Sequence, residues 1–243
     1  MTYDAFFEKC EDIFKLNQIS TQSKKVIPKL FELTEIMLKV NEQMNLTTIT
    51  DQEQIILKHY ADSLSILPYI PKFAKIIDVG CGAGFPSLPL AIAREDIEIV
   101  SLDSTEKRIK YVQSTASSLG LNNLTAITAR AENYAKEEGV RESFDIAVAR
   151  AVADLPVLCE LCIPFVRIGG SFIAMKASKG DDEFSRSQDA IRLCGCDNAQ
   201  IIQADLTQNG TAFEKRRIIL AQKVAPTPKN FPRNFSQISK KPL

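Results

Sequence analysis

The stretch DVGCGAGFPS, residues 78–87, places three glycines at alternate positions between an acidic residue and a proline. It completes a short apolar run, KIIDV (75–79), and leads into a segment that we expect to be helical from Pro86. A glycine-rich loop between a strand and a helix lets the backbone approach a ligand closely. In an open parallel sheet, this loop forms the floor of a ligand crevice outside the carboxyl ends of the strands.

The two residues after the glycines narrow the choice of ligand. A loop that cradles a nucleoside triphosphate continues with Lys and Ser or Thr, whereas this chain has Phe85 and Pro86, so that ligand is excluded. A dinucleotide loop has its third glycine where Phe85 stands, and Pro86 removes an N–H that a pyrophosphate would use. A dinucleotide is therefore disfavoured but stays open, and the loop is suited to close van der Waals contact.

From Lys75 onward, short β-branched runs alternate with helix-length segments, which predicts right-handed crossovers and a doubly wound parallel sheet. The turn signal Asn209-Gly210 then predicts an antiparallel hairpin of 198–206 and 216–224 at the sheet edge. Five alternating units and a hairpin predict a mostly parallel sheet of seven strands, unlike the six-stranded dinucleotide pattern. The expected strands before the hairpin are 75–79, 97–102, 124–129, 144–150 and 171–176, and the expected helices are 86–94, 105–119, 154–166 and 181–194.

Three parts of the chain differ in hydrophobic pattern and composition. Residues 1–70 carry apolar side chains at helical spacing and predict a helical N-terminal extension. Residues 71–224 hold the alternating strands and helices. Residues 225–243 are rich in proline and basic residues and predict an extended C-terminal tail.

The composition favours a soluble cytoplasmic protein: 45% of the 243 residues are hydrophobic, and neither a secretory signal nor a spanning segment is expected. Acidic and basic residues balance at 30 each, but from Leu206 onward eight basic residues face the single acid Glu214. This basic end is suited to meeting phosphates. The six cysteines include a CxxC pair at Cys159 and Cys162, but these share one face of an apolar helix, so core cysteines are expected in preference to a zinc site.

Polar residues follow the ends of three more expected strands. Asp103 comes at the end of the second strand, where a carboxylate accepts hydrogen bonds from ribose hydroxyls. Arg130, Ala131 and Glu132 follow the third strand, where they could read an adenine edge, and Arg150 ends the fourth. Helix capping and ordinary solvated side chains are the alternative interpretations of these residues.

Several further segments, taken in order, carry a resemblance that runs through nearly the whole chain. With these segments the sequence resembles the ribosomal RNA small-subunit methyltransferase G family, also called glucose-inhibited division protein B. The family loop most often has Thr where Cys81 stands and Gly where Ser87 stands. The matching segments are NLTTIT (45–50), KHYADSL (58–64), DVGCGAGFPSLPLAI (78–92), LDSTEKRIKYV (102–112), RAEN (130–133), FDIAVARAVADL (144–155), KNFPR (229–233) and the terminal KPL.

The resemblance implies a class I methyltransferase fold and an activity. A methyl group would pass from S-adenosylmethionine to N7 of a guanine, position 527, in the 16S ribosomal RNA of the small ribosomal subunit. The partners expected on this basis are the 16S rRNA and the small subunit, with no membrane, and the protein is expected to be a monomer. The cofactor-binding residues implied by the resemblance, with Asp103 added from the general logic of the fold, are Gly80, Gly82, Phe85, Asp103, Ala131, Glu132 and Arg150.

Guanine N7 has an in-plane lone pair and no proton, so the transfer needs no general base and only an aligned approach. We expect Arg150 to hold the guanine, with Arg130 as the second candidate, and Phe85 to stack on the base or cover the sulfonium. His59, the only histidine, has no proton to take and is expected, together with Asp62 and Ser63, to order the junction between the helical part and the glycine loop. The expected phosphate contacts are Lys107, Arg108, Arg216, Arg217 and Arg233, with a solvated surface as the alternative for each.

Three other functions stay open from the sequence. The first is a methyltransferase of the same fold that acts on another RNA site or on a small molecule. The second is a nicotinamide-dependent reductase, which would bind NAD(P)H. The third is an RNA-binding or ribosome-assembly protein that keeps the fold without transferring methyl groups.

Overall fold

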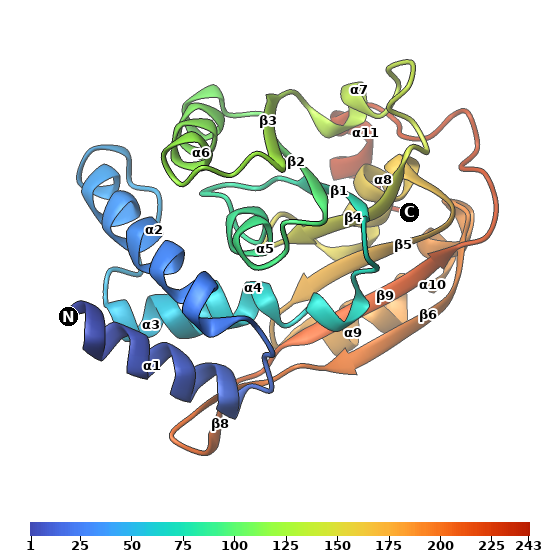
Figure 1. Cartoon of the computed structure of the whole chain (residues 1–243). Coiled ribbons are helices and arrows are strands. Elements are labelled where there is room, and N and C mark those ends of the chain that lie inside the picture. The colour runs from blue at the N-terminus through green and yellow to red at the C-terminus, as the bar shows by residue number, and fades with distance from the viewer.

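Seven strands form one twisted sheet with helices on both faces, in a computed structural model that describes residues 1–243 (Figure 1). The strand order is β3-β2-β1-β4-β5-β9-β6, and β9 alone runs antiparallel to both of its neighbours. The prediction of a mostly parallel seven-stranded sheet is confirmed. The strands are β1 (Lys75–Val79), β2 (Glu98–Asp103), β3 (Leu124–Thr128), β4 (Phe144–Arg150), β5 (Val166–Lys176), β6 (Cys196–Gln203) and β9 (Arg217–Lys223).

Central strands are apolar along nearly their whole length because helices cover both of their faces. In β1, every residue after Lys75 is buried, and in β4 the residues from Ile146 to Ala149 are buried. The chain order reverses between β1 and β4, which are neighbours in the sheet. Such a reversal opens a crevice at the carboxyl ends of the strands, so the loops after these strands are placed to line a site.

The predicted antiparallel pairing of the last two strands is confirmed, but the predicted turn at Asn209 and Gly210 does not connect them directly. Strands β6 and β9 are antiparallel neighbours, but β9 lies inside the sheet and β6 forms the edge. The turn at Asn209 and Gly210 belongs to a separate two-stranded ribbon, β7 (Leu206–Gln208) and β8 (Thr211–Glu214), inserted between them. Both turn residues have positive φ, 52° and 76°, which suits a tight hairpin turn. The Asn-Gly signal was therefore correct locally and assigned to the wrong pair of strands.

The N-terminal part is helical, as predicted, and packs on one face of the sheet (Figure 1). In the first helix the buried residues Phe6, Cys10, Ile13 and Phe14 recur at helical spacing. They share one hydrophobic core with the sheet, in which Tyr60 is fully buried. The elements are α1 (Tyr3–Leu16), α2 (Ser23–Met44), α3 (Gln52–Ile55), a π-helical segment (Ile56–Ala61), α4 (Asp62–Leu64) and a 3-10 turn (Leu67–Tyr69).

The remaining helices follow the predictions with three differences. The expected helix 154–166 is shorter because Pro164 cannot continue the hydrogen-bond ladder, and a 3-10 turn (Ile163–Phe165) replaces its end. The expected helix 181–194 divides at Ser187, whose hydroxyl donates to the carbonyl of Glu183 at 2.6 Å. The short helix α7 was not predicted. The helices are α5 (Ser87–Ala93), α6 (Glu106–Ser118), α7 (Ala131–Tyr134), α8 (Leu155–Cys162), α9 (Gly180–Arg186), α10 (Gln188–Leu193) and α11 (Phe235–Lys240).

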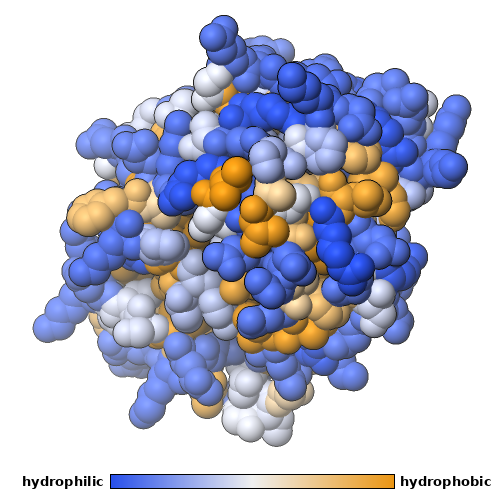
Figure 2. Space-filling view, turned by 90° about the vertical axis from the view of Figure 1, so that its right-hand side faces the viewer, coloured by the Kyte–Doolittle hydropathy of each residue, from blue (hydrophilic) through white to orange (hydrophobic).

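The C-terminal segment is not extended throughout, because its last part forms α11. Ile238 of this helix is fully buried in a second core, which also contains α8 and the opposite face of the sheet. All six cysteines are buried and unpaired, and this agrees with the interpretation of them as core residues. No helix has both the length and the apolarity that crossing a membrane requires. On the face in Figure 2, apolar side chains form separate groups among hydrophilic ones.

Candidate active site

A cavity of about 960 Å³ lies at the carboxyl ends of β1 to β5, at the upper end of the size range of small-molecule sites. The loops after β1, β2, β3 and β4 line it, together with residues from the N-terminal helices, from the β7–β8 ribbon and from α11. The structure brings most of the expected site residues together here. Those in the lining are Gly80, Gly82, Phe85, Asp103, Arg108, Arg130, Ala131, Glu132, Arg150 and Arg216.

The glycine loop is held against the end of β2. The N–H groups of Gly80 and Cys81 donate to the carbonyl of Leu102 at 2.7 and 3.0 Å. Gly80 has a φ of 77°, and a Cβ there would lie 2.6 Å from Cγ2 of Val152. Gly82 has a φ of 57° and no atom within 4 Å of such a Cβ, so its open side faces the cavity that it lines. Only glycine fits the first position, and the second leaves room for a ligand.

Asp103 ends β2 and holds the glycine loop through its carboxylate. Its side chain is only 7% exposed and lines the cavity. Oδ2 accepts from the N–H of Gly82 at 3.0 Å, and Oδ1 accepts from the N–H of Thr105 at 2.8 Å. An ionised carboxylate can accept about four hydrogen bonds, so roughly two positions remain for ligand hydroxyls. Asp103 does not cap α6, because its bond reaches the N–H of Thr105, which is the N-cap residue and has no side-chain cap hydrogen bond. The role of Asp103 as a ribose contact stays a prediction.

Phe85 and His59 form a stacked pair between the glycine loop and the N-terminal helices. Their ring centroids are 4.4 Å apart with an interplanar angle of 15°. His59 Nε2 lies 3.1 Å from the hydroxyl of Thr47. Burial, assisted by the charge of Arg150, lowers the pKa of His59 to about 3, so the imidazole is neutral at neutral pH. The expected role of His59 in ordering this junction agrees with the geometry.

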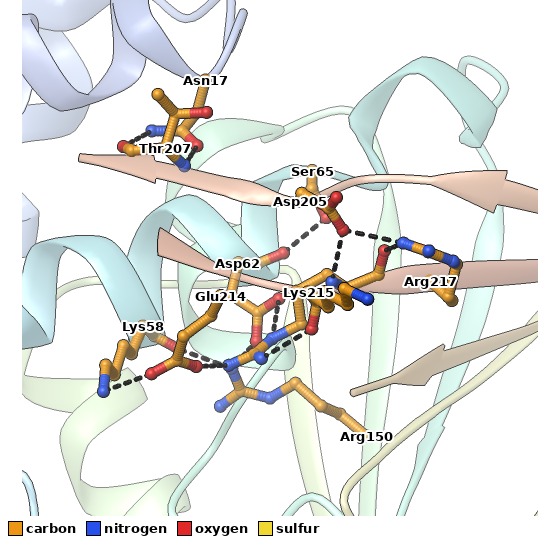
Figure 3. Close-up of polar contacts among 11 residues, drawn as sticks. Asn17, Lys58, Asp62, Ser65, Arg150, Asp205, Thr207, Glu214, Lys215 and Arg217 are labelled. Carbon is orange, nitrogen blue, oxygen red and sulfur yellow. Dashed lines mark hydrogen bonds and ion pairs between the residues drawn. The ribbon is translucent and has the colours of Figure 1, made fainter. Parts of the chain in front are cut away.

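Arg150 is held at the cavity by the N-terminal helical part (Figure 3). Its Nη1 donates to Asp62 Oδ2 at 2.9 Å and to the carbonyl of Lys58 at 3.0 Å. Its guanidinium carbon lies 5.4 Å from the centroid of the Phe85 ring. The other carboxylate oxygen of Asp62 lies 3.3 Å from Nε of Arg216. Arg150 therefore has a fixed position, set by Asp62, a residue that was expected at this junction but not as the partner of Arg150.

The charge network continues into the β7–β8 ribbon. Arg216 pairs with Glu214 at 2.7 Å. Glu214 also pairs with Lys58 (Figure 3). Five side chains of alternating charge therefore join the N-terminal helices, the end of β4 and the ribbon along one wall of the cavity. Arrays of this kind fix the positions of their members, because the three inner side chains, Glu214, Arg216 and Asp62, each pair with two opposite charges.

The start of α7 forms another part of the wall. Ala131 is its first residue, Glu132 is buried at the second, and Arg130 occupies the N-cap position before them. These residues line the cavity, as we expected from their position after the third strand. Their role as adenine contacts stays a prediction.

Three of the expected phosphate contacts do not line the cavity. Arg217 pairs with Asp181 and Asp205, and Lys107 lies on α6 outside the lining. Arg233 donates two charged hydrogen bonds, at 2.8 and 2.6 Å, to Glu160, whose side chain is fully buried. The guanidinium of Arg233 neutralises this buried carboxylate, so the expected phosphate contact at Arg233 is replaced by a structural ion pair.

Lys176 and Glu183 are site residues that the sequence reasoning missed. The Nζ of Lys176 lies 2.6 Å from Glu183 Oε2 and donates to the carbonyl of Ala153 at 2.7 Å, and Glu183 accepts from the N–H of Leu155. This buried pair fixes the loop after β4 that packs against Gly80. The available signal was the position of Lys176 at the end of β5, since the ends of parallel strands line the site.

The two positions at which the loop departs from the usual family pattern are both buried. Burial raises the pKa of the Cys81 thiol, so it is protonated at neutral pH. The N–H of Ser87 donates to Asp78 Oδ2 at 3.2 Å, and burial raises the pKa of Asp78 to about 7. Cys81 therefore acts as a small neutral residue in the lining, while Ser87 fixes the start of α5.

Comparison with known proteins agrees with this geometry. The family model described as GidB, rRNA small subunit methyltransferase G, matches residues 26–210. This chain belongs to that family. A ribosomal RNA small subunit methyltransferase G of Clostridium beijerinckii is 37% identical over 99% of this chain and 98% of its own. One from Acetivibrio thermocellus is 42% identical over 89% and 88%.

The fold has relatives among solved structures as well. A SAM-dependent O-methyltransferase from Thermotoga maritima superposes with a TM-score of 0.53 at 15% identity, covering 79% of this chain and 73% of its own. At this level of identity the likeness concerns the fold alone. It agrees with the class I methyltransferase architecture that the strand order shows.

Proposed function

We propose that this protein transfers a methyl group from S-adenosylmethionine to N7 of a guanine in 16S ribosomal RNA, at the position, 527, that the family resemblance indicates. The observation that carries the proposal is the cavity at the strand ends, which is lined by the Asp103 carboxylate at the end of β2, the open face of Gly82 after β1 and the anchored Arg150 at the end of β4. Membership of the family supports the same activity.

The residues present fit S-adenosylmethionine. The Asp103 carboxylate lines the cavity and keeps free acceptor positions, and Gly82 presents an open backbone to the same cavity. Phe85, from the same loop as Gly82, also lines the cavity. When bound, this cofactor supplies an electrophilic methyl group on a sulfonium. The ring of Phe85 is buried in the lining of the cavity, and the face of an aromatic ring attracts a positively charged sulfur.

The chain's own contribution is orientation and not proton transfer. The His59 imidazole is neutral and stacked, and guanine N7 has no proton to give, so no side chain has to act as a base. Arg150 presents its remaining N–H groups from a position fixed by Asp62, and can donate to guanine O6 or to a phosphate. Holding the base for an aligned approach supplies much of the acceleration available to such a transfer.

The RNA surface that we propose is the rim of the cavity. Arg108, Arg130 and Arg216 line it, and Lys107 lies next to Arg108 on α6. Phosphate contacts from such a rim make the affinity for RNA fall steeply with salt. We infer further that residues 71–224 carry the transfer chemistry, that residues 1–70 supply the wall that fixes Arg150, and that the protein works in the cytoplasm as a monomer on the small subunit or its RNA.

The test is transfer of a labelled methyl group to small-subunit rRNA, both naked and assembled into the subunit. The proposal expects label in the RNA and binding of S-adenosylhomocysteine, but not NAD(P)H, in calorimetry. NAD(P)H binding without methyl transfer would favour the reductase alternative, and RNA binding without transfer would favour a non-catalytic assembly protein.

A further inference from the structure

The C-terminal segment is fastened to the body on both sides of one aromatic residue, Phe235. On one side, Arg233 binds the buried carboxylate of Glu160 through its guanidinium, and its own N–H donates to the same carboxylate at 2.7 Å. On the other side, Ile238 is fully buried against the core that contains α8. The Asn234 side chain caps α11 by accepting from an N–H of its first turn at 3.0 Å. The position of Phe235, the first residue of α11, is therefore set by its neighbours.

The ring of Phe235 is not part of that core. Its residue is 42% exposed, and it lines the large cavity together with Leu161 of α8. Helices α7 and α11 both contact α8 (Figure 1), so Phe235 stands on the same wall as Ala131 and Glu132 at the start of α7. A rigidly anchored aromatic ring that faces a cavity presents a flat apolar surface to whatever enters it.

The two walls of the cavity differ in chemistry. The wall from the N-terminal helices and the ribbon carries the charges of Lys58, Asp62 and Arg216, which suits a phosphate-bearing nucleotide. The wall from α7, α8 and α11 offers the apolar side chains of Leu161 and Phe235 beside the polar start of α7 with Arg130 and Glu132, a combination that suits a purine ring with a polar edge. Asp103, at the end of β2, lies between the loop after β1 and the start of α7 in the sheet order. A ribose bound there would lie next to the end of β3, after which α7 begins.

We propose that Phe235 is a cofactor-binding residue, whose ring packs against the adenine of S-adenosylmethionine and closes the adenosine end of the site. The C-terminal helix is then part of the cofactor site and not only a basic tail for RNA. This inference rests on the proposed function, because it requires the chain to bind this cofactor.

The chain contains no tryptophan, which provides a direct test. In Phe235→Trp the new indole is the only one, and titration with S-adenosylhomocysteine is expected to change its fluorescence saturably. Half-saturation should match the dissociation constant from calorimetry on the same variant. Phe213→Trp is the matched control, since Phe213 is 47% exposed but lies on the ribbon and outside the lining. Its fluorescence should not follow the cofactor.

Two further variants measure the contribution to affinity. Phe235→Ala is expected to weaken binding of S-adenosylhomocysteine about tenfold, the size found when an aromatic partner of a base is removed, while Phe235→Tyr stays within about twofold of the parent. The melting temperature without ligand should be nearly unchanged, because the ring is partly exposed.

The outcomes separate this inference from the proposed function. If the parent chain binds S-adenosylhomocysteine and Phe235→Ala binds it equally well, or the indole at position 235 gives no cofactor-dependent signal, the assignment of Phe235 is wrong and the proposed function stands. If the parent chain does not bind S-adenosylhomocysteine, the proposed function fails and this inference fails with it.

Discussion

Replacement of Arg150 by alanine tests the anchored arginine most sharply. The substitution removes the 2.9 Å pair with Asp62, the 3.0 Å bond to the carbonyl of Lys58 and the contact with the Phe85 ring. Asp62 keeps Arg216 at 3.3 Å, so its charge is not left without a partner. We therefore expect a loss of about 2 kcal/mol in the free energy of unfolding, below the cost of stranding a buried charge.

That loss leaves the protein folded. For a chain of this length it corresponds to a fall of about 4–8 °C in melting temperature. Methyl transfer is expected to fall by about 100-fold or more, because the guanine loses the group that positions it. The assays are thermal unfolding and single-turnover transfer of a labelled methyl group to small-subunit rRNA at 25 °C.

Asp62→Asn is the matched control. It keeps the Arg150 guanidinium and removes the charge that fixes it, so we expect a similar loss of stability but a smaller loss of transfer, about tenfold. Transfer by Arg150→Ala at more than half of the parent rate would refute the role assigned to Arg150. Equal losses of transfer in the two variants would show that the pair only supports the fold.

Three other changes have defined outcomes. Gly80→Ala forces a Cβ to within 2.6 Å of Val152 at a φ of 77°, and should cost about 1–3 kcal/mol of stability and weaken S-adenosylhomocysteine binding in calorimetry; unchanged values in both would contradict the close approach. Arg233→Met leaves the buried Glu160 carboxylate without its cation and should lower the free energy of unfolding in urea by about 3–5 kcal/mol, whereas a change below about 1 kcal/mol would mean that the pair is not formed. The pKa of Asp78 is about 7 in the fold against 3.8 in the unfolded chain, so the folded state retains a proton that the unfolded state releases, and the free energy of unfolding should fall as pH rises from about 4 to 7. Asp78→Asn should lose this pH dependence. If urea unfolding shows the same change between pH 5 and pH 8 in parent and variant, the assignment of the slope to Asp78 is refuted.

The sheet was predictable because its strands are distinct in the sequence. Buried parallel strands appear in the sequence as short apolar runs, and the runs of β1 and β4 are of this kind. The Asn209-Gly210 turn shows the limit of local signals, since it identifies a hairpin but not which strands the hairpin joins. Helix α7 spans four residues, too few for a periodic pattern, and its existence depends on the strand end before it.

The site was predictable where it depends on strand ends and unpredictable where it depends on distant contacts. Asp103 and Arg150 follow strands whose carboxyl ends must meet, so their convergence follows from the topology. Asp62 lies 88 positions before Arg150, and no local pattern marks it as the partner. Arg233 was predicted as a phosphate contact because nothing near it in the sequence shows the buried Glu160, 73 positions away, that binds it. The location of Phe235 depends on that same pair.

The central claim is methyl transfer to N7 of one guanine, and mapping the modified base tests it most directly. The parent protein is incubated with labelled S-adenosylmethionine and small-subunit rRNA, and the product RNA is cleaved chemically at N7-methylguanine and read by primer extension. A single new cleavage at guanine 527, absent without cofactor and strongly reduced with Arg150→Ala, is the expected result. Label at another base, at several bases or at none would contradict the account.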